Sequence, residues 1–132
     1  MSHENVEVVR EAIAAANERD VDGYLACCAD DVQLFMPNYE VEGVYEGAAG
    51  VRRYFGDVEA AVPDLHLEVE RMEPIGLDRV LVFLRVTGHG RASGIASDTG
   101  GSNIYELSNG KIERLRVYRD RDQALEAAGL SE

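Results

Sequence analysis

Hydrophobic positions in the first part of the chain recur at the spacing of helices. Near the start, an apolar residue returns every three or four positions, at Val6, Val9, Ile13 and Ala16. This stripe predicts a first amphipathic helix. Asp20 suits the N-cap of a second helix, which the pair Asp30-Asp31 is expected to end. A third helix is predicted between Gly47 and Pro63.

A period of two, typical of strands, takes over from Leu65. This alternation predicts one strand face with Leu65, Leu67, Val69 and Arg71, and the other with His66, Glu68, Glu70 and Met72. Strands are predicted at residues 32–36, 65–72, 80–87, 102–107 and 112–118. Turns are expected at residues 74–78, 88–101 and 109–110. A short helix is predicted within residues 120–129. This order predicts an α+β domain, in which three N-terminal helices pack on a curved, mostly antiparallel sheet and a short C-terminal helix follows.

Length and charge narrow the class of protein. The 132 residues fit a single domain, expected to span residues 1–132. The formal net charge is −12, so binding to nucleic acid or to an anionic membrane surface is not expected. No apolar run approaches the ~20 residues that span a bilayer, and the first residues lack the features of a signal peptide. The sequence therefore predicts a cytoplasmic protein.

The cysteines and histidines do not form a recognisable metal site. Cys27 and Cys28 are adjacent, which seldom allows disulfide geometry, and two thiols fall short of a structural zinc site. We interpret them as small helix residues, one of them buried, with a reactive vicinal pair as the alternative. His3, His66 and His89 lie on separate predicted elements, so no metal is expected. No dinucleotide-binding fingerprint is present, so no cofactor is expected either.

Three short motifs stand at characteristic places in this order of elements, namely Asn17-x-x-Asp20, Asp30-Asp31 and Asn109-Gly110-Lys111-Ile112. Together with the spacing of the elements, they resemble the nuclear transport factor 2-like superfamily. That superfamily includes ketosteroid isomerase and the SnoaL-like polyketide cyclases. The resemblance covers nearly the whole chain and implies a cone-shaped fold with a pocket inside the curved sheet.

The same resemblance argues against the chemistry of ketosteroid isomerase. Counted from the shared landmarks, the isomerase's tyrosine, base and protonated aspartic acid fall on Ala12, Met36 and Asn103. Alanine and methionine can neither donate nor abstract a proton, so only Asn103 keeps a hydrogen-bond donor. Isomerase chemistry by this constellation is therefore not expected.

The resemblance also implies a set of ligand-binding residues, namely Tyr24, Met36, Asn103, Tyr105, Leu115 and Val117. A mostly apolar pocket with a few polar groups is typical of a site for a small apolar molecule. The apolar members would equally suit a solid core. His89 is the candidate catalytic residue, because imidazole titrates near neutral pH. The alternative is an exposed loop histidine beside glycines.

Two classes of function stay open. One is a small isomerase, cyclase or hydrolase that acts on an apolar metabolite, and the other is a non-catalytic ligand-binding or dimerisation module. Arg85 is either an inward anchor for a carboxylate ligand, or a side chain that reaches the edge of the strand or pairs with a glutamate. A homodimer is expected, because relatives form dimers through the outer sheet face, where this chain carries Arg114, Arg116 and Tyr118.

Overall fold

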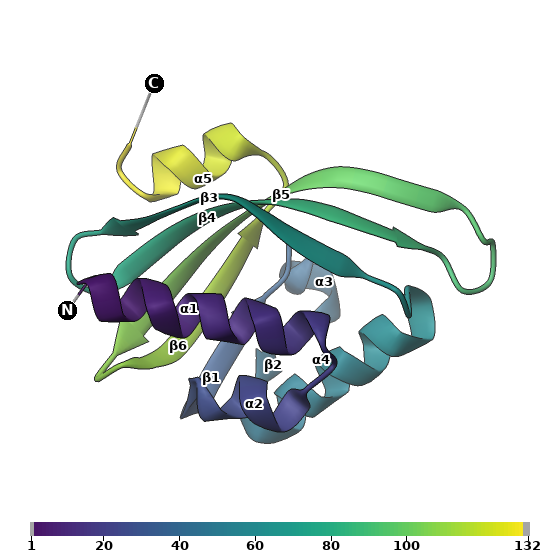
Figure 1. Ribbon diagram of the computed structural model, residues 1–132, viewed down its shortest axis with the longest axis horizontal. Helices are drawn as coiled ribbons and strands as arrows, with labels where there is room; N and C mark the ends of the chain where they lie inside the picture. The colour runs from purple at the N-terminus through teal and green to yellow at the C-terminus, as the bar shows by residue number, and fades with distance from the viewer. Residues whose placement is uncertain (1, 131–132) are drawn as a thin grey trace.

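The computed structural model describes residues 2–130 and shows a helical layer, a curved sheet and one covering helix (Figure 1). The helices are α1 (Ser2–Asn17), α2 (Val21–Ala26), α3 (Tyr39–Glu42), α4 (Gly47–Ala61) and α5 (Arg121–Ala127). The strands are β1 (Cys28–Phe35), β2 (Tyr45–Glu46), β3 (His66–Ile75), β4 (Arg79–His89), β5 (Ala96–Ser108) and β6 (Lys111–Tyr118). Helices α1, α2 and α4 lie on one face of the sheet and α5 lies on the other. The predicted α+β class, with its short C-terminal helix, is confirmed.

The strands form one sheet in the order β2-β1-β6-β5-β4-β3. Neighbours are antiparallel except for β1 and β6, which run parallel. Asn109 and Gly110 turn the β5–β6 hairpin with φ values of 53° and 74°, as expected of an Asn-Gly turn. The β4–β5 hairpin extends beyond the body of the domain and reaches the end of α4 (Figure 1), where the Arg91 N–H donates to the Ala61 carbonyl at 2.9 Å.

Aspartate side chains cap the N-termini of two helices. Asp20 accepts a hydrogen bond from the Gly23 N–H at 2.9 Å and so caps α2. Asp120 caps α5 in the same way, through the Gln123 N–H at 2.8 Å.

Within the described residues, no helix has both the length and the apolar character needed to cross a membrane.

A β-bulge in β3 changes which residues face the helices. The register between β3 and β4 shifts between Val69 and Arg71, so Glu70 is left over. Simple alternation predicted Arg71 on the same face as Val69. Instead Met72 packs into the main core, and the Arg71 guanidinium lies on the opposite face, 5.6 Å from the centroid of the Phe83 ring. The prediction for this stretch was wrong because the bulge reverses the alternation.

The pair Asp30-Asp31 does not end a helix, as the sequence predicted, but lies inside β1. Helix α2 ends earlier, and Cys28 already pairs with Ile112 of β6. The register of β1 against β6 then shifts before Gln33, and both aspartates are exposed in this irregular stretch. Sheet pairing here overrides the local preference of aspartate. Both cysteines are buried, and Cys28 belongs to a strand, so their interpretation as helix residues with one buried was wrong.

Two other boundaries differ from prediction. Strand β3 continues through Pro74, which is tolerated because β3 is an edge strand and the missing N–H breaks no ladder. Strand β5 begins at Ala96 rather than near residue 102, since the exposed hairpin extension is held by cross-strand pairing and not by an apolar pattern.

The two faces of the sheet bury separate apolar clusters. The larger cluster fills the space between the sheet and α1, α2 and α4. The smaller one lies under α5, where Leu81, Phe83 and Ile104 pack against Ala124 and Leu125. Strand β4 is therefore apolar on both faces, which explains its almost continuous run of hydrophobic residues.

Candidate functional site

A cavity of about 150 Å³ lies between the helical layer and the inner face of the sheet. The helices contribute Ile13, Ala16, Tyr24 and Tyr54. The sheet and the segments next to it contribute Met36, Leu65, Leu67, Leu84, Val86, Gly101, Asn103, Tyr105, Leu115 and Val117. All six residues predicted to bind a ligand therefore lie around one cavity. Strand register turns Asn103, Tyr105, Leu115 and Val117 to the same face, and α2 brings Tyr24 against them.

Asn103 is the amide of this cavity and is only 6% exposed. It lies on the central strand β5, opposite Val82 of β4 and Val117 of β6. Its Nδ2 donates to Tyr105 Oη at 3.4 Å, a long hydrogen bond. Within residues 2–130 the Asn103 side chain makes no other hydrogen bond. A buried amide with unused hydrogen-bonding capacity favours a further polar partner in the cavity.

Three tyrosine side chains accompany this amide. Burial raises the pKa of Tyr24, and the neighbouring Tyr105 hydroxyl raises it further. Burial likewise raises the pKa of Tyr105 and of Tyr54, while the Arg19 guanidinium opposes the shift at Tyr54. These phenols therefore stay neutral at physiological pH and can donate or accept hydrogen bonds.

The cavity offers no obvious acid or base. In the part of the chain that the structure describes, its lining includes no carboxylate and no imidazole. Ala12 and Met36 stand at the positions of the isomerase's tyrosine and base. Ala12 is fully buried and does not line the cavity, whereas Met36 lines it. The arrangement can hold an apolar body and orient one polar atom. It does not place a group that titrates near neutral pH against that atom.

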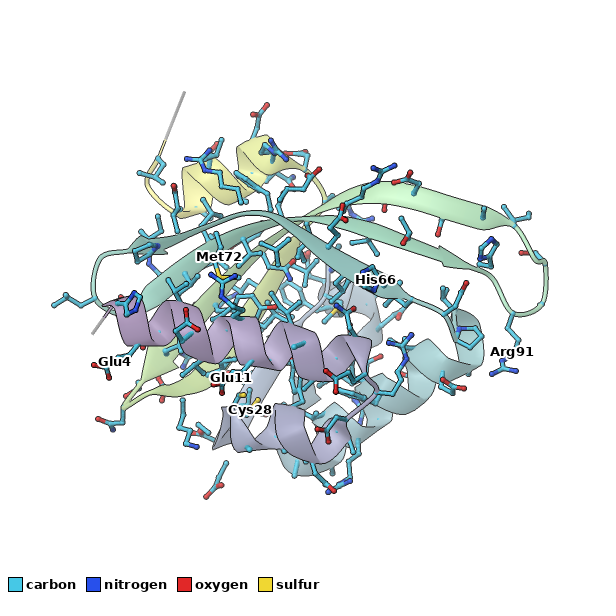
Figure 2. All side chains as sticks on the ribbon, viewed as in Figure 1. Glu4, Glu11, Cys28, His66, Met72 and Arg91 are labelled. Atoms are coloured by element: carbon cyan, nitrogen blue, oxygen red, sulfur yellow. The ribbon has the colours of Figure 1, made fainter. Side chains whose placement is uncertain are left out.

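His89 lies outside the cavity, at the end of β4, where it pairs with Ala96 next to the turn of the β4–β5 hairpin. Figure 2 labels Arg91 at this end of the molecule, far from α1. The His89 side chain is 60% exposed, and its Nδ1 lies 2.7 Å from Asp64 Oδ2. Hydrogen bonds from His89 hold the pKa of Asp64 below its ordinary value. The structure therefore does not bring His89 together with the cavity residues.

Arg85 does not reach the cavity either. Its Nε donates to Asp98 Oδ1 at 2.8 Å across the β4–β5 hairpin, and both side chains are about half exposed. This hydrogen bond lowers the pKa of Asp98. The inward anchor for Arg85 is therefore wrong. The side chain lies at the surface, as the alternative predicted, but its partner is the aspartate Asp98 and not a glutamate.

The architecture and the cavity agree with a known family of domains. A family model described as the SnoaL-like domain matches residues 9–115. The chain belongs to this SnoaL-like family. The predicted resemblance is therefore confirmed. No curated protein matches the sequence of this chain at a significant level.

Solved structures share the fold of the SnoaL-like domain. An uncharacterised cystatin-fold protein from Novosphingobium aromaticivorans is 28% identical, with a TM-score of 0.75 over 90% of this chain and 99% of that one. A Mycobacterium tuberculosis protein in complex with estradiol-17β-hemisuccinate is 22% identical, with a TM-score of 0.76 over 90% and 95%. A protein with a ketosteroid isomerase-like fold from Catenulispora acidiphila, in complex with trimethylamine, is 16% identical, with a TM-score of 0.75 over 94% and 93%.

Sequence reasoning missed several lining residues of the SnoaL-like domain, above all Tyr54. The signal for Tyr54 was present, because it lies three residues after Val51 and four before Val58 and so shares their helix face. Leu84 and Val86 could not be assigned from the pattern, since β4 is apolar on both faces. The alternation placed Leu65 and Leu67 on one strand face but did not connect that face with the pocket.

A larger, open groove of about 730 Å³ lies on the outer side of the SnoaL-like domain, between α3, α5 and the ends of β1 and β6. Met36 and Val117 line both hollows, so they separate the groove from the cavity. In the groove, the Arg116 guanidinium lies 4.3 Å from the centroid of the Phe35 ring, and its Nε donates to Glu106 at 3.2 Å. The groove thus combines aromatic rings with charged side chains, of which Arg116 is paired with Glu106.

Proposed function

We propose that this SnoaL-like domain binds a small apolar molecule that carries a hydrogen-bonding group. The observation that carries the proposal is Asn103, a buried amide with one long hydrogen bond in a cavity otherwise lined by apolar residues and tyrosines. The apolar body of such a ligand gains by leaving water, while the amide and the tyrosine hydroxyls orient its polar atom.

The volume of the cavity sets the size of the ligand. A cavity of about 150 Å³ accommodates a molecule of roughly benzene size. Sites for larger, drug-sized ligands usually measure about 300–1,000 Å³. A larger ligand would therefore require Met36 and Val117 to move, which would join the cavity to the outer groove.

Complexes of two related folds support small-molecule binding in general. The mycobacterial protein is in complex with estradiol-17β-hemisuccinate, and the Catenulispora protein with trimethylamine. These two molecules differ greatly in size and polarity. The class of ligand proposed for this chain therefore rests on its own cavity.

Binding is favoured over proton-transfer chemistry. An isomerase, cyclase or hydrolase usually needs an acid or base whose pKa lies near the working pH. The hydroxyls of Tyr24, Tyr54 and Tyr105 have raised pKa values, and Asn103 does not titrate. An enzymatic role for this cavity would have to use a bound water or a group supplied by the substrate.

Thermal unfolding with simple ligands tests the proposal. Toluene, indole and benzamide should each raise the melting temperature of the wild-type protein, because a ligand that binds the native state stabilises it. Val117→Phe should fill part of the cavity and reduce this rise, whereas the exposed substitution Leu77→Ser should leave it unchanged. If none of the three ligands raises the melting temperature of the wild type, the proposal is wrong.

We also propose that the domain forms a homodimer through its outer sheet face. Arg114 and Arg116 are both paired with Glu106 of the same chain, so a second copy could approach without repulsion between unpaired arginines. Phe35 and Tyr39 would contribute aromatic area to that contact. Light scattering should give twice the mass of one 14.5 kDa chain, and a monomer mass at micromolar concentration would contradict the proposal.

A further inference from the structure

Arg19 has an unusual backbone and an unusual environment. It connects α1 to α2 with a φ of 58°, in the left-handed region that favours glycine. A non-glycine residue in this region needs support from its surroundings. Here the side chain turns back and is partly buried against the start of β3.

Backbone carbonyls accept hydrogen bonds from only some of the nitrogen atoms of the Arg19 guanidinium. One terminal nitrogen donates to Ala16 O at 2.8 Å, and the other donates to Pro63 O at 2.9 Å and to Leu65 O at 2.8 Å. The Nε atom is buried and has no hydrogen-bond partner. In residues 2–130, it is the only buried side-chain nitrogen or oxygen atom left in this state. No carboxylate of the described residues lies within 4.0 Å of the guanidinium either.

A small crevice lies beside this group. Its volume is about 20 Å³, and Arg19 lines it together with Phe55 and Val58. The remaining lining residues are Ala16, Tyr54, Leu65 and Leu67. These same four residues also line the 150 Å³ cavity, so the two spaces share a wall. About 10–15 Å³ is enough for one water-sized atom, so the crevice can take one oxygen.

We propose that the ligand of the cavity is an apolar acid, and that one oxygen of its carboxylate occupies the crevice and accepts a hydrogen bond from Arg19 Nε. This inference rests on the proposed function and adds the chemical class of the ligand. The apolar body would fill the cavity beside Leu84 and Leu115, while Tyr54 lies at the wall between body and carboxylate. A charge-assisted hydrogen bond in a water-poor site is stronger than a neutral one.

The structural role of Arg19 does not account for the free Nε. The bonds to Pro63 O and Leu65 O already connect the α1–α2 turn to the segment between α4 and β3, and the bond to Ala16 O holds the turn itself. A buried N–H of a charged group that lacks an acceptor is costly, so an acceptor in the crevice should stabilise the protein. The net charge of −12 repels anions at long range. The free energy that favours binding of a carboxylate must therefore come from its local contact with Arg19.

Benzoate, benzamide and toluene separate this inference from the proposed function. All three carry a benzene ring, which the cavity accommodates, but only benzoate carries a carboxylate. Dissociation constants measured by NMR titration near 0.15 M salt should show benzoate binding at least about tenfold more tightly than benzamide. Benzoate should also shift the Arg19 Nε–Hε resonance, and toluene should not. If toluene binds but benzoate is not preferred and leaves this resonance in place, the Arg19 inference is wrong and the proposed function stands. If no ligand binds, both fail.

Substitutions make the test independent of the resonance assignment. Arg19→Gly removes the guanidinium and relieves the left-handed backbone, so it should weaken benzoate about tenfold and leave toluene unchanged. If that variant does not fold, Arg19→Met provides the same comparison, because it keeps an unbranched apolar side chain and removes both the charge and the Nε–H donor. Arg10→Gln removes one exposed positive charge on α1 and serves as the control. An equal loss of benzoate binding in Arg10→Gln, or no loss in either Arg19 variant, would overturn the inference.

Discussion

The side chain of Asn17 pairs with the backbone of Leu67 through two hydrogen bonds. Asn17 Nδ2 donates to the Leu67 carbonyl at 2.9 Å, and the Leu67 N–H donates to Asn17 Oδ1 at 2.8 Å. The Asn17 amide thus supplies partners for the Leu67 N–H and carbonyl on the edge strand β3. It also fixes the end of α1 against the sheet. Because Leu67 and Ala16 both line the cavity, this contact holds two of its walls together.

Replacing Asn17 should destabilise the whole domain. Asn17→Ala removes both hydrogen bonds and leaves the Leu67 N–H and carbonyl without partners in a partly buried place. We expect a loss of about 2 kcal/mol in the free energy of unfolding, measured by urea denaturation. Glu18→Ala, at the exposed next position, is the matched control and should change stability by less than about 0.5 kcal/mol. Equal stability of the two variants would contradict this role.

Asn103→Leu should change the selectivity of the cavity and keep the fold. Leucine keeps the branched shape of asparagine with a somewhat larger apolar volume, and it removes the one amide of the cavity. Binding of toluene should stay within about threefold, whereas benzamide should lose about tenfold, because its carbonyl loses a donor. Calorimetric titration of both ligands measures the difference. An unchanged ratio between benzamide and toluene would show that Asn103 does not contact the ligand.

His89→Ala should alter Asp64 and leave ligand binding unchanged. The hydrogen bonds from His89 lower the pKa of Asp64 below 3.8, so their contribution to stability is present above that value and is lost as pH falls through the lowered pKa. NMR titration should find the Asp64 pKa closer to 3.8 in the variant than in the wild type. A change in toluene or benzoate affinity would instead connect the hairpin to the cavity.

The two cysteines should be unreactive in the native protein. Burial raises the pKa of Cys27, and it raises the pKa of Cys28 to about 12. The reactive thiolate is therefore scarce at pH 8, and both side chains are buried. A thiol reagent such as Ellman's reagent should modify both residues in urea and neither of them within minutes in buffer. Rapid modification in buffer would favour the reactive vicinal pair.

Much of the fold could be predicted because it depends on local periodicity. The helical stripe before Asn17 and the Asn109-Gly110 turn each follow from a few neighbouring residues. The strand through Asp30 and Asp31 could not, because pairing with distant strands overrides what aspartate prefers locally. The β3 bulge was missed for a similar reason, since no residue near Glu70 indicates a bulge. The cytoplasmic location and the homodimer stay predictions.

The candidate site was predictable only where strand register decides it. Asn103, Tyr105, Leu115 and Val117 meet because β5 and β6 pair in the order that their alternation indicates. Arg19 was not predicted, because its contact with Pro63 joins residues 44 positions apart and depends on how a long side chain folds back. His89 was singled out by its chemistry alone, and the long hairpin carries it away from the cavity.

The most direct test of ligand binding in the cavity is a methyl NMR titration of the wild-type protein with toluene. We expect saturable shifts centred on Leu84 and Leu115, which line the cavity but not the outer groove. Ala127, which lines only the groove, should not move. Shifts centred on Ala127, or no saturable shift at Leu84 and Leu115 up to the solubility limit of toluene, would contradict the account.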